Sequence, residues 1–124
     1  VKSVGVGDGA LLAATPGTQA HDGIFRVGRK TNHAGGIEGG MSNGEDVVVE
    51  VACKPLSTVP GGLPTVDIAT GQESRGHVER SDVCAVPSAS IVGEAMVCVV
   101  LADALLEKFG GDSLLQVKRH MGRP

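Results

Sequence analysis

Residues 88–109 read SASIVGEAMVCVVLADALLEKF, and this stretch decides the fold class. Ser88 follows Pro87 as a suitable N-cap and Gly110 is a natural stop, so the segment predicts a single helix. About 22 residues give a helix roughly 33 Å long. Its apolar residues fall on nearly every face, a pattern typical of a helix that is buried on most sides. We therefore expect a long buried helix that lies between two layers.

The best strand signal lies upstream, at residues 46–53, where the sequence DVVVEVAC is dominated by β-branched residues. Residues 10–14 predict a shorter strand, and a second helix is expected from Asp112 or Ser113, with Ser113 and Gln116 placed as a capping box. Because strands and helices do not alternate regularly, this order favours an α+β sandwich. The chain has too few strands to cover both sides of the long helix, which indicates missing chain or an oligomer.

The composition bounds the class of protein. The 124 residues suffice for one domain, but aromatic residues make up only 2% and there are 19 glycines, so the core must be thin. The net charge of −3 argues against a nucleic-acid-binding protein, because such proteins carry a basic surface. Cysteines and histidines show neither metal-ligand nor disulfide spacing, so we expect no metal, free thiols, and histidines that are mostly ordinary surface or loop residues. The cysteines are Cys53, Cys84 and Cys98, and the histidines are His21, His33, His77 and His120.

The longest strongly apolar stretch, residues 95–102, is bounded by Glu94 and Asp103. It is far shorter than the ~20 residues that a membrane span needs, so no membrane partner is expected. The N-terminus resembles neither a signal peptide nor a transit peptide, and free thiols suit the reducing cytoplasm. The chain lacks an initiating Met, which indicates that it is cut or processed.

Two segments carry backbone and side-chain groups suited to binding an anion. Residues 32–44 read NHAGGIEGGMSNG, and their bare amides can surround a phosphate, although a tight-turning loop before a strand is the alternative. The segment matches neither the dinucleotide fingerprint nor the P-loop. Lys54 ends the best strand and is followed by Pro55 and two hydroxyls. Lysine is a common phosphate partner, and capping of a strand edge is the alternative role.

A third segment places Arg80 two residues before Asp82. In an extended backbone both side chains point to the same side. The pair suits binding an anion and relaying a proton, because the arginine keeps the carboxylate ionised. A structural salt bridge is the alternative. A nearby group of cations is expected to form a solvated basic turn: Arg26, Arg29 and Lys30.

Taken together, these segments resemble the chorismate synthase family, in the family's order and at its spacing. The matching pieces cover essentially the whole chain and comprise Gly7-Asp8-Gly9, Ala20-His21-Asp22, residues 32–44, Lys54-Pro55, Arg80 to Pro87 and residues 106–113. The resemblance implies that residues 1–124 are the C-terminal part of a single chorismate synthase domain. It also implies the family's β-α-β sandwich with helices between sheets, present here only in part, and usually a homotetramer.

The activity implied by the resemblance is that of a lyase in the shikimate pathway of aromatic amino acid biosynthesis. 5-Enolpyruvylshikimate 3-phosphate loses phosphate and a proton in a 1,4-anti elimination, giving chorismate. Reduced FMN is the implied cofactor, although the reaction has no net redox change, and NADP is associated with this cytoplasmic flavoprotein. Neither a nucleic acid nor a membrane is an implied partner.

The resemblance also implies roles for particular residues. Gly39 matches a glycine at the flavin site, and Asp82 matches an aspartate proposed to help flavin N5 accept the proton. The family's segment that wraps FMN is matched by Lys54, Pro55, Leu56, Ser57 and Thr58, and its arginine contact is matched by Arg80. The family's two catalytic histidines and several substrate-binding arginines lie in an N-terminal portion outside this chain. We therefore expect the isolated chain to be inactive, with an FMN- or phosphate-binding fragment or a structural assembly segment as the alternatives.

Overall fold

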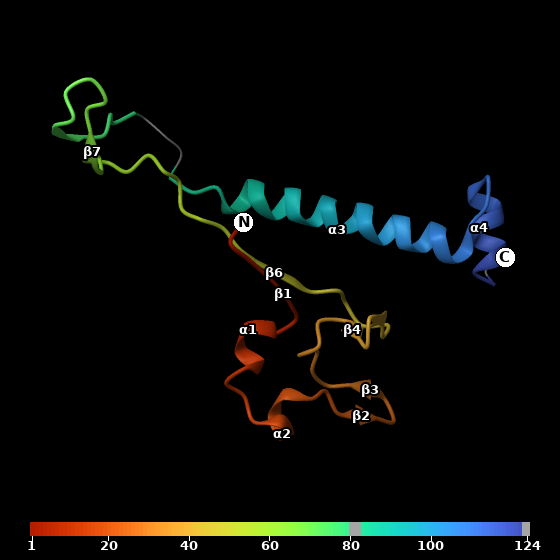
Figure 1. Ribbon diagram of the computed structural model, residues 1–124. Coiled ribbons are helices and arrows are strands. Elements are labelled where there is room, and N and C mark those ends of the chain that lie inside the picture. The colour runs from red at the N-terminus through yellow and green to blue at the C-terminus, as the bar shows by residue number, and fades with distance from the viewer. Residues whose placement is uncertain (80–82, 123–124) are drawn as a thin grey trace. The chain divides into compact units, whose positions relative to one another are not determined.

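The computed structural model describes residues 1–79 and 83–122. The chain divides into two compact units, Val1–Lys54 and Pro55–Pro124, and the ribbon in Figure 1 labels the elements of both. Small sheets and helices occur together, which confirms the α+β class. The sheets that the described residues form are four separate antiparallel pairs, so the layers of the expected sandwich are not assembled by this part of the chain.

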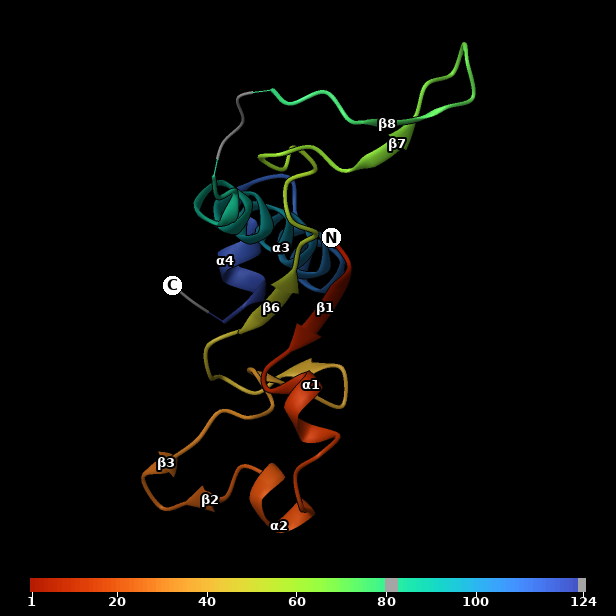
Figure 2. The same ribbon diagram turned by 90° about the vertical axis from the view of Figure 1, so that its left-hand side faces the viewer.

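The first unit is built on the antiparallel pair of β1 (Ser3–Val6) and β6 (Val49–Ala52), which Figure 2 shows side by side. Val4 lies opposite Val51 and Val6 opposite Val49, so cross-strand valine pairs fix the register. The strand predicted at residues 46–53 is confirmed, although its regular part is shorter.

Single-turn helices and two-stranded hairpins complete this unit. They are α1 (Gly9–Leu12), α2 (Gly17–Ala20), β2 (Ile24–Phe25), β3 (Gly28–Arg29), β4 (Ile37–Glu38) and β5 (Met41–Ser42). The strand predicted at residues 10–14 is wrong, because these residues begin with the helical turn of α1. The carbonyl oxygen of Asp8 accepts from the amides of Leu11 and Leu12 at 2.7 and 3.1 Å. A short apolar run cannot by its period distinguish a strand from a helical turn.

Glycine allows two backbone segments of the first unit to cross closely. A Cβ on Gly7 would lie 2.1 Å from the carbonyl oxygen of His33, and a Cβ on Gly35 would lie 2.2 Å from the nitrogen of Gly7. Both glycines are buried and have positive φ, of 57° and 62°. The carbonyl oxygen of Val48 accepts from the Gly7 amide at 2.9 Å, and the Val48 amide donates to Gly35 at 3.1 Å. The start of the glycine-rich segment is thereby fixed between β1 and β6.

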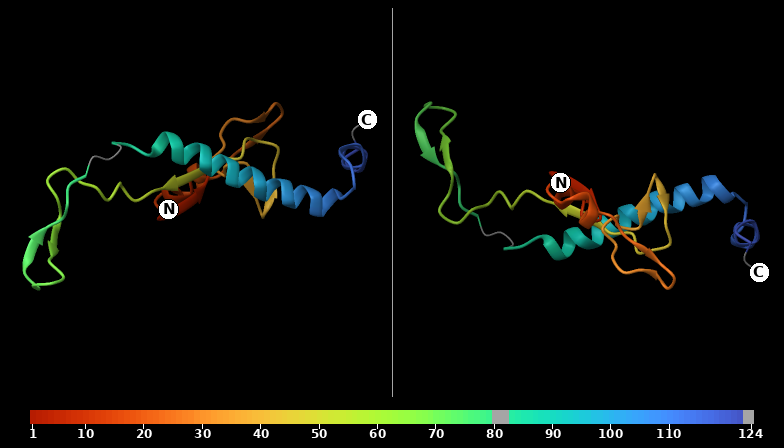
Figure 3. Two further views of the ribbon diagram at one scale, coloured as in Figure 1. Left: turned by 90° about the horizontal axis from the view of Figure 1, so that it is seen from above. Right: turned by 90° about the horizontal axis from the view of Figure 1, so that it is seen from below.

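The second unit contains one hairpin and two helices. β7 (Pro64–Val66) pairs with β8 (Glu73–Arg75), and the carboxylate of Asp67 caps the turn between them by accepting from the amides of Ala69 and Thr70. α4 (Leu114–His120) folds across the C-terminal end of the longer α3 (Val86–Phe109; Figure 3). Its predicted cap is confirmed, since Ser113 Oγ accepts from the Gln116 amide at 3.3 Å.

The long helix α3 (Val86–Phe109) has 24 residues, which confirms the helix predicted at 88–109. It begins earlier than Ser88, with Ala85 at the N-cap, because a proline in the first turn is tolerated and Pro87 therefore does not delay the start. Gly110 ends the helix as predicted, with φ of 56° and its amide bonded to Leu106 at 2.8 Å.

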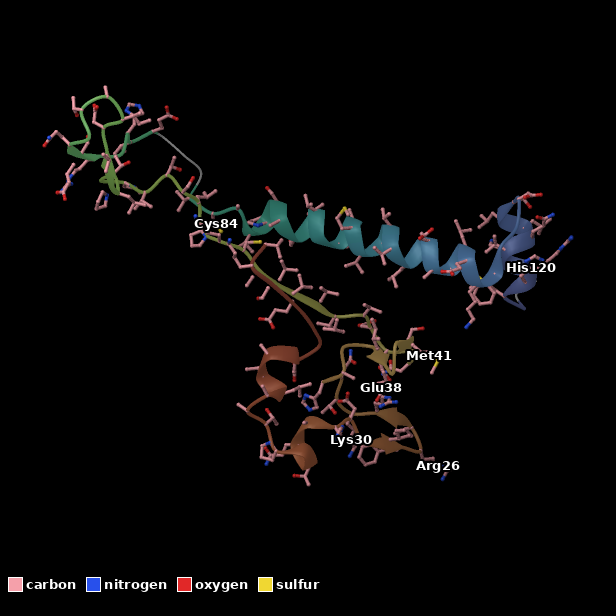
Figure 4. All side chains as sticks on the ribbon, in the orientation of Figure 1. Arg26, Lys30, Glu38, Met41, Cys84 and His120 are labelled. Carbon is pink, nitrogen blue, oxygen red and sulfur yellow. The ribbon has the colours of Figure 1, made fainter. Side chains whose placement is uncertain are left out.

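The expected burial of α3 is not found in this chain. No α3 residue is buried, and its side chains project freely along the helix in Figure 4. Ile91, Met96 and Val100 remain 60–65% exposed. Across the described residues, Val117 is the only hydrophobic side chain that is buried. The described residues thus form the helix as predicted, but they bury none of its side chains.

Length and composition alone make α3 a candidate membrane span, with a mean hydropathy of 2.0 over 18 residues. The argument from residues 95–102 does not hold for the whole helix, because apolar residues continue beyond the single charges of Glu94 and Asp103. A core helix of a soluble protein passes the same test.

Gly7→Ala should destabilise the first unit by several kcal/mol, since the methyl group meets the backbone of His33 at a positive φ. Gly5→Ala is the matched control, because a Cβ at Gly5 meets nothing within 4 Å. Urea unfolding followed by the NMR amide signals of residues 1–54 measures both variants. Equal midpoints for the two variants would show that the crossing is not tight.

Candidate functional site

The carboxylate of Asp22, which follows α2, gathers three donors from a segment about ten residues later. Oδ1 accepts from the Thr31 hydroxyl at 2.6 Å and from the His33 amide at 2.8 Å, and Oδ2 accepts from the Ala34 amide at 2.9 Å. Partial burial opposes ionisation, but these hydrogen bonds outweigh it and lower the pKa of Asp22 from 3.8 to about 2. The carboxylate therefore stabilises the fold above pH 3.8, and this contribution is lost as the pH falls towards 2.

The imidazole of His33 lies beside a second carboxylate. Its Nδ1 is 2.6 Å from Asp8 Oδ2, and the exposed fractions of the two side chains are 30% and 43%. The hydrogen bond with Asp8 raises the pKa of His33 above 6.5 against the effect of desolvation, and the charges of Asp22 and Asp8 act in the same direction as the hydrogen bond. The backbone joins the same partners, because the carbonyl oxygen of His33 accepts from the Asp8 amide at 2.9 Å.

Asn32 connects this cluster to the glycines that follow. Its Oδ1 accepts from the Gly36 amide at 2.8 Å, and its Nδ2 donates to the carbonyl oxygen of Asp46 at 2.9 Å. A Cβ on Gly36 would lie 2.4 Å from that same oxygen, so the segment is clamped against the approach to β6. β4 begins at the next residue, Ile37.

The β4–β5 hairpin then carries Gly39, the glycine predicted at a flavin site. Gly39 and Gly40 form its two-residue turn, with φ of 56° and 77°, and two positive φ angles are what a type I′ turn requires. A Cβ on either glycine would meet nothing within 4 Å, so this turn presents bare backbone to open space. Glu38, immediately before the turn, forms an ion pair with Arg29 at 2.6 Å and accepts from Asn43 Nδ2 at 2.9 Å.

The remaining predicted residues lie elsewhere along the chain. Lys54 is exposed and is the last residue of the first unit, whereas Pro55 begins the second. Residues 55–58 form neither helix nor strand; Leu56 is half-buried, and the two hydroxyl side chains, Ser57 and Thr58, are exposed. Arg80 and Asp82 lie outside the described residues. The structure therefore places Gly39 and Lys54 in one unit and the four following residues in the other.

Several residues of the hydrogen-bonded cluster were not predicted from the sequence. The expectation that most histidines are ordinary surface or loop residues did not single out His33, whose ring is held by Asp8. The solvated basic turn is wrong for Arg29, whose side chain is only 15% exposed and is paired with Glu38. Arg26 does lie at the tip of the β2–β3 hairpin (Figure 4). The available signal was the position of carboxylates beside glycines, as in Gly7-Asp8 and Asp22-Gly23.

Two shallow concavities of about 390 Å³ each are lined by residues of the second unit. One lies between the end of α3 and α4, and is mainly apolar. The other lies on the β7–β8 hairpin. None of the predicted site residues that the structure describes lines either of them.

These features define an α+β protein whose first unit depends on glycine-mediated backbone contacts. The chorismate synthase family model matches residues 1–106. The chorismate synthase of Nocardioides sp. is 56% identical over 97% of this chain and 32% of its own length, and that of Streptomyces avermitilis is 53% identical over 98% and 32%. A crystal structure of chorismate synthase superposes with a TM-score of 0.71 at 41% identity, covering 98% of this chain and 30% of its own.

The chain therefore belongs to the chorismate synthase family, as predicted. It spans about a third of the length of the curated relatives that it matches. The predicted C-terminal placement of that third stays a prediction.

His33 should titrate above pH 6.5, and Asp8→Asn should return its pKa towards that value. Because folding raises this pKa, the stabilisation from the pair is fully present below pH 6.5 and is lost as the pH rises through the pKa of the folded state. NMR of the imidazole nitrogens gives both pKa values. Asp103→Asn, a change in α3, is the control and should leave the titration of His33 unmoved; an unaltered pKa in Asp8→Asn would rule out the pairing.

Proposed function

We propose that this chain is part of a chorismate synthase, a lyase that eliminates phosphate and a proton from 5-enolpyruvylshikimate 3-phosphate to give chorismate. The observation that supports this function best is 56% identity to chorismate synthases across 97% of the chain. We extend the proposal to the shikimate pathway, a cytoplasmic location and a homotetramer. The reaction itself is proposed for the full-length protein that contains this chain, here named the parent enzyme.

The chain's residues fit a phosphate-bearing flavin. The open turn at Gly39 lets a planar ring or a phosphate approach the backbone without meeting a side chain. Lys54 offers an exposed ammonium group, and the hydroxyls of Ser57 and Thr58 offer further donors. When held by these residues, reduced FMN would supply electron density for the elimination. Pro55 stiffens the backbone between the lysine and the hydroxyls, so that these donors follow one another along a restrained segment.

The roles proposed for Arg80 and Asp82 rest on the sequence alone. A guanidinium group stabilises an anion by paired donors, and a carboxylate accepts or relays a proton at the reacting centre. We assign Arg80 to the flavin contact and Asp82 to the proton.

The isolated chain is proposed to be inactive. It spans about a third of its relatives' length, and no residue of α3 is buried. Burying an apolar helix of this kind requires a second surface, and the rest of the parent enzyme is the proposed source of that surface. An inactive FMN-binding fragment is the second candidate, supported by the open turn at Gly39.

Lys54→Gln in the parent enzyme should weaken FMN binding about tenfold or more, because a hydrogen bond to a charged group contributes about 1.5–3 kcal/mol. FMN fluorescence titration gives the Kd. Lys118→Gln removes an equal charge from α4 and should leave the Kd unchanged. The same titration of residues 1–124 separates the two candidates: saturable binding without turnover identifies the inactive FMN-binding fragment, and its absence means that the site needs the rest of the parent enzyme.

Asp82→Ala in the parent enzyme should slow turnover by roughly 10²–10⁴-fold, the range for loss of a general acid or base, while changing the Kd for FMN much less. Single-turnover kinetics at saturating FMN separate chemistry from binding. Comparable losses in turnover and in FMN affinity would instead assign Asp82 a structural role.

A further inference from the structure

Among the described residues, Asp22 forms no hydrogen bond with those proposed to contact the flavin, but its carboxylate holds the segment that leads to one of them, Gly39. The three hydrogen bonds that its carboxylate accepts are donated by the Thr31 hydroxyl and by the backbone amides of His33 and Ala34. Because two of these donors are backbone amides, the carboxylate fixes the path of the main chain and not only the rotamer of a side chain. A fixed, half-buried carboxylate with both oxygens occupied leaves this segment little freedom.

Two routes lead from Asp22 to the turn that carries Gly39. The first follows the chain: the Ala34 amide is held by Asp22, the next glycine crosses Gly7, and Asn32 holds the Gly36 amide one residue before β4. Only two residues then separate this point from Gly39.

The second route runs through a side chain. The guanidinium group of Arg29 donates to the backbone carbonyl oxygen of Asp22 at 3.5 Å, and it pairs with Glu38 at 2.6 Å. Glu38 is the residue immediately before Gly39. The carboxylate of Asp22 is therefore linked to the approach to the turn, and the backbone carbonyl of Asp22 is linked through Arg29 to the residue before the turn.

We propose that Asp22 is a positioning residue for FMN binding: its carboxylate sets the place and orientation of the Gly39–Gly40 turn. This inference rests on the proposed function, because it takes Gly39 as a flavin contact. Residues that hold a ligand-contacting group by hydrogen bonds commonly change affinity by about 10–100-fold when they are altered, as at metal sites. A displacement of about 1 Å in a contact is enough for such an effect.

Asp22→Asn in the parent enzyme tests the proposal, since it keeps the shape of the side chain but replaces one acceptor oxygen with an amide donor. We expect the Kd for FMN to rise about tenfold. Hydrogen–deuterium exchange of residues 33–42 should also become faster, both with and without FMN. These two readouts do not depend on turnover.

Asp67→Asn is the matched control. Asp67 likewise accepts from two backbone amides in a turn, and the hydrogen bonds from Thr70 and Ala69 lower its pKa. The substitution should speed exchange in the β7–β8 turn and leave the Kd for FMN unchanged. Thr31→Val is a milder second variant, because it removes only the hydroxyl bond at 2.6 Å and keeps both amide bonds. It should raise the Kd by a smaller factor, and it serves if Asp22→Asn fails to fold.

The outcomes separate the two proposals. If wild-type parent enzyme binds FMN and the Asp22 and Thr31 variants bind it equally well despite faster exchange at residues 33–42, Asp22 has only a structural role and the positioning inference is overturned. If the wild-type enzyme itself does not bind FMN, the proposed function fails and the inference fails with it. Weaker FMN binding in the Asp22 or Thr31 variant, with an unchanged Kd in Asp67→Asn, supports both.

Discussion

The backbone crossing at Gly7 and Gly35 is the contact on which the rest of the first unit depends. At this point the end of β1 and the glycine-rich segment approach so closely that neither position has room for a Cβ. The crossing brings Asp8 next to His33, although 24 residues separate them in the chain, and their side chains and backbones then bond to each other. Hydrogen bonds therefore do here what apolar packing does in a larger domain.

The glycines of this segment have two opposite uses. Gly35 and Gly36 are buried and lie against the backbones of other segments, so each is needed because nothing larger fits. Gly39 and Gly40 are exposed and face open space, and their positive φ angles serve the turn itself. The buried pair holds the exposed pair in place. One half of the glycine-rich segment is therefore structural, and the other half is accessible.

Local signals made part of this structure predictable from the sequence. α3 and its stop at Gly110, the cap of α4 at Ser113, and the strand that contains β6 each depend on residues within one turn or one ladder. The bonds of Asp22 and the pairing of Arg29 with Glu38 join residues roughly ten positions apart through loops. Such contacts have no period in the sequence, so periodicity and capping rules do not reveal them. The assignment of Gly39 and Lys54 came from the family resemblance, since their chemistry alone also fitted a turn and a strand edge.

The exposure of α3 has a consequence for the life of the chain in a cell. The hydrogen bonds of such a helix are local, but most of the stability of a helix in a protein comes from packing against other segments. Until other segments cover it, the helix presents continuous apolar surface of the kind that chaperones retain and that drives aggregation. In the proposed parent enzyme, the speed with which a second surface covers α3 would therefore decide between assembly and aggregation.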